Sequence, residues 1–151
     1  MLNIRKMENN DRAQVLAMDT EFYSGPAVDH QIPESELLRT FELALEADYP
    51  LDGFMLMDDE GIAGFAYVTW FHSTDVAGLC VLLEEIFIRQ SARGRGYGPE
   101  FIRFMFDHYK QARRFRLEVT KENEAASHVY RKMGFEYISY DQMYKDAEPE
   151  A

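Results

Sequence analysis

The sequence contains only one cysteine, Cys80, so its 151 residues cannot form a disulfide within the chain. It also lacks any apolar run of about 18 residues, the length that a membrane-spanning helix needs. Its first residues do not show the basic and then apolar pattern of a secretory signal peptide. Together, these absences predict a cytoplasmic protein that has no membrane partner.

Positive charge is scarce as well, with 16 Lys and Arg residues against 27 Asp and Glu residues and a net charge of −11. This balance argues against nucleic acid as a partner. The charge is uneven, because residues 1–88 contain 4 basic and 17 acidic side chains, whereas residues 89–132 contain 11 and 5. The basic block is either a solvated helix face or a site for an anionic ligand, with the acidic part available to a cationic one.

Hydrophobic residues make up 46% of the chain and aromatic residues 14%, which is typical of a folded protein. The length suits one domain, which we expect at residues 1–145, followed by a short acidic tail at 146–151. Apolar periodicity predicts helices at 13–22, 33–49, 99–110 and 123–133, with a loop at 24–32. It predicts strands at 2–7, 54–57, 62–71, 79–88, 115–119, 135–139 and 142–144.

The resulting order, β-α-α-β-β-β-α-β-α-β-β, predicts an α/β fold. We expect a mixed central sheet of six or seven strands, flanked by about four helices. The strand, helix and strand between residues 79 and 119 should form a parallel crossover.

A glycine-rich segment, Arg93-Gly94-Arg95-Gly96-Tyr97-Gly98, lies between a predicted strand and the helix that Pro99 begins. Alternate glycines let successive backbone N–H groups turn toward one point, and the helix N terminus adds unpaired N–H donors. No Gly-Lys-Ser/Thr follows, which excludes a P-loop, and Pro99 stands where a dinucleotide fingerprint has its third glycine. The segment is therefore either a tight turn or a phosphate site of another kind.

A second informative segment is the predicted helix that begins at Asn123. Asn123, Ala126 and Tyr130 are spaced at i, i+3 and i+7, so they share one helix face. Gly134 follows at the position that commonly ends a helix, and Phe135 comes next. By itself the helix could simply pack its tyrosine on the sheet. As part of a site, Ala126 would allow close approach, while Asn123 and Tyr130 would offer an amide and a phenol.

Together, the two segments resemble the GNAT superfamily of N-acetyltransferases. The first matches the signature Arg/Gln-x-x-Gly-x-Gly/Ala at Arg93, Gly96 and Gly98. The second matches Asn-x-x-Ala-x-x-x-Tyr-x-x-x-Gly-Phe over residues 123–135. The resemblance extends over about residues 79–144, and it implies acetyl-CoA as co-substrate, no metal and a possible homodimer.

The resemblance also implies roles for individual residues. The backbone of residues 93–99 would hold the pyrophosphate of acetyl-CoA, and the strand before it would pair with the pantetheine amides. Tyr130 would be the general acid that protonates the leaving thiolate. The implied cofactor-binding residues are Ile86, Phe87, Ile88, Arg93, Gly94, Arg95, Gly96, Tyr97, Gly98, Pro99, Asn123 and Ala126.

Acyl transfer also needs a base or a water path, because only about one aliphatic amine in 10³ is neutral at pH 7. Glu84 and Glu85 lie in an otherwise apolar strand, on opposite faces unless a bulge intervenes. We expect Glu84, in phase with Ile86 and Ile88, to be the base or an ammonium anchor, with Glu85 or a water chain as the alternative base. Residues 83–88 are most similar to the Leu-Glu-Asp-Φ-Φ-Val of spermidine/spermine acetyltransferases, with Glu85 replacing the Asp.

The resemblance therefore implies transfer of acetyl to a small cationic amine, such as a polyamine, by direct attack on the thioester. An acidic N-terminal half would attract such an acceptor. Other acceptors stay open, namely a protein N terminus, a lysine or an amino acid. A CoA-binding regulatory protein without turnover is a further alternative.

Overall fold

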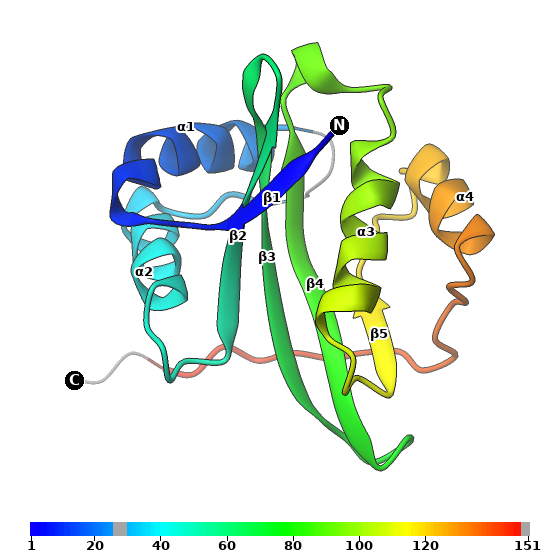
Figure 1. The fold of residues 1–151 in the computed structure, drawn as a ribbon. Coiled ribbons are helices and arrows are strands. Elements are labelled where there is room, and N and C mark those ends of the chain that lie inside the picture. Colours follow the sequence, from blue (N-terminus) through cyan, green and yellow to red (C-terminus); the bar gives the residue numbers. More distant parts are fainter. Residues whose placement is uncertain (26–29, 149–151) are drawn as a thin grey trace.

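The computed structural model describes residues 1–25 and 30–148. Its central sheet consists of β1 (Asn3–Lys6), β2 (Leu51–Asp58), β3 (Gly61–Ser73), β4 (Gly78–Ile88) and β5 (Arg114–Leu117), in that order (Figure 1). The first four strands pair antiparallel, and β5 joins β4 in parallel. The predicted mixed sheet and the parallel crossover between β4 and β5 are confirmed.

Two helices cover each face of the sheet (Figure 1). On one face lie α1 (Arg12–Tyr23) and α2 (Glu34–Ala44), and on the other lie α3 (Tyr97–His108) and α4 (Glu124–Lys132). The predicted helix at 33–49 is too long, because α2 ends at Ala44 and a turn follows, in which the Leu51 N–H donates to the Tyr49 carbonyl. The predicted loop at 24–32 and the predicted tail at 146–151 lie partly outside the described residues.

Each face of the sheet has its own apolar core. The face under α1 and α2 buries Val15, Met18, Phe41, Met55, Phe65, Tyr67 and Phe87. The face under α3 buries Leu56, Val68, Val81, Leu83, Phe101, Ile102 and Met105, and Tyr130 and Met133 pack against it from around α4. Burial on both faces fixes the register of the long strands, because a one-residue slip would exchange the two cores.

β4 contains a bulge at Glu84. Leu83 pairs with Val68 and Glu85 pairs with Tyr67, so Glu84 is an extra residue without a partner on β3. The bulge changes the phase of the strand. Leu83 before it and Ile86 after it both belong to the core under α3, although they are three positions apart. Glu85 consequently points to the face that carries α1.

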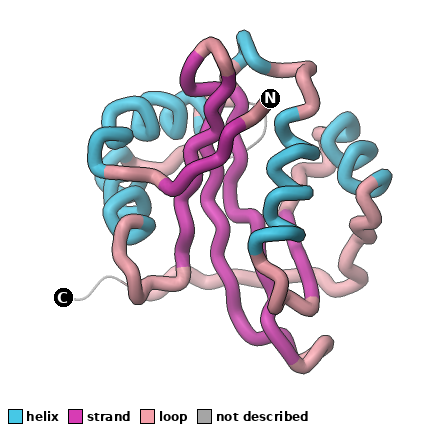
Figure 2. The backbone as a smooth tube through the Cα atoms, viewed as in Figure 1, coloured by secondary structure: helices cyan, strands magenta, loops and turns pink. Residues whose placement is uncertain are grey.

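The described part of the chain contains no strand after α4, so the predicted strands at 135–139 and 142–144 are wrong and the sheet has five strands. Residues 135–148 leave α4 as a loop, which passes behind the lower part of the sheet in the view of Figure 2. A strand needs a neighbour for its backbone groups, and this segment has none among the residues that the structure describes. Among residues 1–25 and 30–148, no helix is both long and apolar enough to cross a membrane.

Candidate active site

β4 and β5 pair along only part of β4. Their four residue pairs run from Cys80 with Arg114 to Leu83 with Leu117, and β4 then continues to Ile88 with no partner on that side among the described residues. Ile86, Phe87 and Ile88 lie along this free edge. An extended ligand with amide groups could therefore pair with β4 there as an added strand would.

The glycine-rich segment connects the end of β4 to α3. Gly94 and Gly96 both have a φ of 79°, which favours glycine on conformational grounds. Gly98 does not have a positive φ, and a Cβ built on it would meet no atom within 4 Å. The protein itself thus gives no reason for glycine at this position. Close approach of a ligand to the backbone supplies one.

The N terminus of α3 has no side-chain cap, and the space beside Gly98 is open. Gly96 occupies the N-cap position, and no side chain accepts a hydrogen bond there. The N–H groups of Tyr97 and Gly98 have no protein acceptor within the described ranges, and Pro99 has no N–H. The free donors and the positive end of the helix dipole suit the pyrophosphate of acetyl-CoA.

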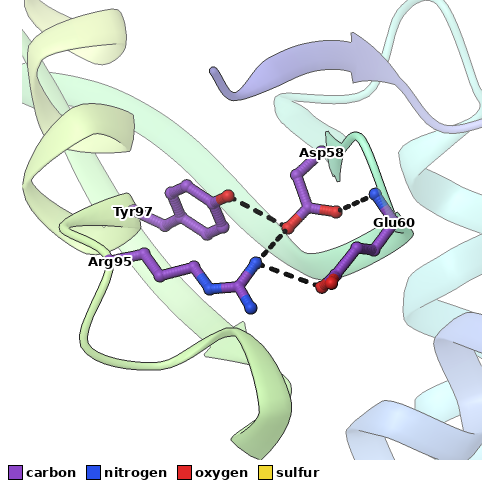
Figure 3. Close-up of polar contacts among 4 residues, drawn as sticks. All are labelled: Asp58, Glu60, Arg95 and Tyr97. Carbon is purple, nitrogen blue, oxygen red and sulfur yellow. Dashed lines mark hydrogen bonds and ion pairs between the residues drawn. The ribbon is translucent and has the colours of Figure 1, made fainter.

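Arg95 and Tyr97 anchor the loop to the β2–β3 turn (Figure 3). Arg95 Nη1 lies 3.3 Å from Asp58 Oδ2 and 3.1 Å from Glu60 Oε2. The Tyr97 hydroxyl donates to the same Asp58 oxygen at 3.0 Å. The backbone N–H of Glu60, then Tyr97 and Arg95, lower the pKa of Asp58, so this carboxylate stays charged. Arg95 is therefore engaged by carboxylates of the protein.

Arg93 is placed differently. Its Nε donates to the carbonyl of Ile88 at 2.9 Å, and its guanidinium lies 5.7 Å from the ring centroid of Phe87. Its other guanidinium nitrogens have no acceptor among the residues that the structure describes. Arg93 thus satisfies the last carbonyl of β4, and its remaining N–H donors are available to an anion.

Asn123 caps the N terminus of α4, and a Schellman motif at Gly134 ends the helix. Asn123 is the N-cap, and its Oδ1 accepts the N–H of Ala126 at 3.3 Å. The N–H groups of Gly134 and Phe135 donate to the carbonyls of Arg131 and Tyr130, respectively. Gly134 has a φ of 99°, which confirms the predicted helix end. The cap uses the amide oxygen of Asn123 and leaves its NH₂ group for a ligand.

Tyr130 packs against the core under α3, with its ring centroid 6.1 Å from that of Phe135. Its hydroxyl makes no hydrogen bond to another described residue. Burial raises the pKa of the phenol, so at neutral pH it carries its proton. A neutral phenol can donate that proton to a leaving thiolate.

Glu84 lies at the bulge, where β4 and β5 part, and its side chain is only partly exposed to solvent. Partial burial raises the pKa of its carboxyl, and the nearby charges of Glu118 and Glu85 raise it further. A carboxylate with a raised pKa is a better proton acceptor at neutral pH. Sequence reasoning did not single out Glu118, which directly follows β5.

Glu85 belongs to a polar cluster inside the α1 face. The Tyr23 hydroxyl donates to Glu85 Oε1 at 2.6 Å. Asp19, one helical turn before Tyr23, is 1% exposed, and Tyr67 of β3 is equally buried. Burial raises the pKa of Tyr67, and the negative charge of the Asp19 and Glu85 pair raises it further. The sequence pattern did not single out Asp19, Tyr23 and Tyr67, although a carboxylate among apolar helix positions is a signal of a polar site.

Two other features lie apart from this constellation. A hollow of about 580 Å³ runs along a different face of α4 from that of Tyr130 and is lined by Lys121, Glu124, Ser127, His128, Arg131, Lys132 and Tyr137. Cys80 is fully buried, and burial raises the pKa of its thiol, which suits a core residue better than a nucleophile. No group of three metal-ligating side chains occurs in residues 1–25 and 30–148.

Comparison with solved structures finds the same fold in known acetyltransferases. The aminoglycoside N-acetyltransferase AAC(6')-Iy, solved with CoA, is 26% identical over 97% of this chain and 95% of its own, with a TM-score of 0.76. A predicted acetyltransferase from Clostridium acetobutylicum, solved with acetyl-CoA, is 18% identical over 96% of each chain (TM-score 0.76). A possible acetyltransferase from Clostridium difficile 630 is 14% identical over 99% of each chain (TM-score 0.80).

Sequence comparison extends the assignment beyond the fold. No curated protein matches the chain in sequence. The family model described as the acetyltransferase (GNAT) family matches residues 13–135, which include the glycine loop and the motif of α4. The chain therefore belongs to the GNAT family and is an acetyltransferase with acetyl-CoA as co-substrate.

Proposed function

We propose that the protein transfers acetyl from acetyl-CoA to a primary amine of a small cationic acceptor, with polyamines as the leading class. The observation that carries this proposal is the carboxylate of Glu85, which the bulge directs to the α1 face and Tyr23 holds at 2.6 Å. A fixed carboxylate without a cationic partner among the described residues suits an ammonium group.

The charge distribution supports the same acceptor class. Residues 1–88, which include α1 and α2, contain 17 acidic and only 4 basic side chains. Such a surface raises the local concentration of a polycation and steers its approach. The structural relative AAC(6')-Iy was also solved with a bisubstrate analogue of CoA and acetylneamine, and aminoglycosides carry several amino groups.

We assign the proton transfers to two residues of this chain. The amine nitrogen attacks the thioester carbonyl while Glu84, the partly exposed carboxylate at the bulge, accepts the amine proton. The C–S bond then breaks, and Tyr130 donates its proton to the sulfur. Glu85 binds a cationic group of the acceptor, and the free edge of β4 with the loop 93–99 holds the co-substrate.

The setting that we propose is the cytoplasm, because the lone cysteine is buried and reduced. A homodimer, which the resemblance implies, is also part of the proposal. Neither point is needed for the chemistry assigned above.

The test is an acceptor screen that follows thiol release from acetyl-CoA. Spermidine, lysine, a peptide N terminus, a neutral aromatic amine and an anionic amino acid would each be assayed at low and high salt. We expect spermidine to have the highest kcat/KM, and salt to lower that value. Preference for neutral or anionic acceptors, without a salt effect on the cations, would refute the acceptor class. Absence of turnover with every amine would favour the CoA-binding regulator.

A further inference from the structure

We infer that Asp19 works as a carboxylic acid that shares its proton with Glu85 and thereby fixes that carboxylate on the acceptor side. Asp19 is then a positioning residue that acts through Glu85. The inference rests on the proposed function, in which Glu85 binds the acceptor.

Without a proton on Asp19, several buried polar atoms of the cluster of Asp19, Glu85 and Tyr67 have no hydrogen-bond partner among the described residues. Neither carboxyl oxygen of Asp19 has a hydrogen-bond donor among the described residues, although the side chain is 1% exposed. Glu85 Oε2 and the Tyr67 hydroxyl are buried and unpaired in the same way. An isolated buried carboxylate is costly, whereas an acid supplies its own O–H donor. Glu85 is the side chain with which Asp19 shares a hydrogen bond.

The electrostatics agree with the geometry. Burial raises the pKa of Asp19 far above its usual range, and a hydrogen bond to Glu85 and the charge of Glu85 raise it further. The titratable groups around Asp19 are Tyr23 on its own helix, Tyr67 on β3 and Glu85 on β4. None of these groups is a cation. The pair therefore keeps one proton at neutral pH and carries one negative charge.

This arrangement explains how Glu85 can present a single, fixed charge. The Tyr23 hydroxyl donates to Oε1, and the Asp19 acid is available to donate to the carboxylate from α1 as well. Two donors on one carboxylate restrict its rotation. One negative charge then matches one ammonium group of the acceptor.

The first test measures the proton on Asp19 directly and needs no substrate. The carboxyl carbon of Asp19 would be followed by NMR in the full chain, with Asp19→Asn used to assign the signal. We expect a protonated carboxyl at pH 7. A carboxyl that titrates at the ordinary value of about 3.9 would overturn the inference.

The second test separates positioning from packing by kinetics. Asp19→Asn retains a donor for Glu85, so KM for a cationic acceptor should stay within about threefold of wild type, whereas Asp19→Ala should raise it about tenfold. In both variants kcat and the affinity for acetyl-CoA should change little. Equal damage by the two substitutions would mean that Asp19 acts as an anion. If no amine is acetylated, the proposed function fails, but the NMR titration still decides the state of Asp19.

Discussion

Tyr23 and Glu85, 62 positions apart, are joined by a hydrogen bond of 2.6 Å that ties the end of α1 to the bulged part of β4. Burial and the carboxylate of Glu85 raise the pKa of the Tyr23 phenol. The phenol therefore remains a donor at every pH at which the enzyme would be assayed.

Replacing Tyr23 by Phe removes the donor and keeps the ring. We expect KM for a cationic acceptor to rise about five- to tenfold, because a hydrogen bond to a charged group contributes about 1.5–3 kcal/mol and water can replace part of it. The affinity for acetyl-CoA should not change. Steady-state kinetics with Tyr49→Phe as the control would measure this, and an unchanged KM would remove Tyr23 from the acceptor site.

Gly98→Ala should weaken acetyl-CoA binding about tenfold or more without destabilising the protein. The backbone at Gly98 is compatible with alanine, which removes some freedom from the unfolded chain, and the added Cβ meets only open space. Gly96→Ala should lose both affinity and stability, because Gly96 has a φ of 79°. Calorimetric titration and thermal melting of both variants would show the contrast. Full affinity in Gly98→Ala would mean that the ligand does not approach this position.

Tyr130→Phe should bind acetyl-CoA normally and lower kcat by about 10²-fold, the lower end of the range for general acids. The melting temperature should stay close to that of wild type, since the hydroxyl makes no hydrogen bond to a described residue. Pre-steady-state assays would separate binding from turnover. A loss below about threefold would assign Tyr130 to packing.

The two arginines of the loop should respond differently to salt. Arg93→Met removes a cation with free donors, so it should weaken acetyl-CoA binding and reduce the salt dependence of Kd. Arg95 is already paired with Asp58 and Glu60, so Arg95→Met should change the salt dependence much less. Titrations at two ionic strengths would compare them. Equal changes in salt dependence would show that Arg95 also contacts the anion.

The pH dependence of stability reports on Asp19. Its pKa is raised on folding, so the folded state keeps a proton that the unfolded chain has released. Its contribution to stability is therefore fully present below the unfolded pKa and falls as the pH rises toward the folded one. The slope from this group is at most about 1.4 kcal/mol per pH unit. Asp19→Asn should remove that slope in urea unfolding between about pH 5 and pH 8, and an unchanged slope would contradict the assignment.

Local signals were sufficient to predict the parts of the site that lie on α3 and α4. Gly94, Gly96 and Gly134 have positive φ values, and glycine beside a predicted helix end is the usual sign of such a conformation. The shared helix face of Asn123, Ala126 and Tyr130 follows from their spacing alone. These features depend on a few adjacent positions. The structure accordingly has both helices close to their predicted ranges.

Long-range relationships could not be predicted in this way. Whether Glu84 is an extra residue depends on how β4 aligns with β3, and strand alternation alone cannot show it. The proximity of Asp19 to Glu85 depends on the docking of α1 on the sheet. The predicted strands at 135–139 and 142–144 are wrong for a similar reason. A segment with strand propensity forms a strand only when its backbone pairs with the edge of another strand.

The bulge has a consequence for how such a site could arise. Without Glu84, the remaining residues of β4 would alternate regularly, with Leu83, Ile86 and Ile88 toward α3 and Glu85 and Phe87 toward α1. Both cores would keep their side chains, and the ladder with β3 would run without interruption. Insertion of a single codon into the gene for such a plain strand would therefore add the bulge, and with it Glu84, without repacking either core. The proposed base could therefore be gained or lost through insertion or deletion of a single residue in β4.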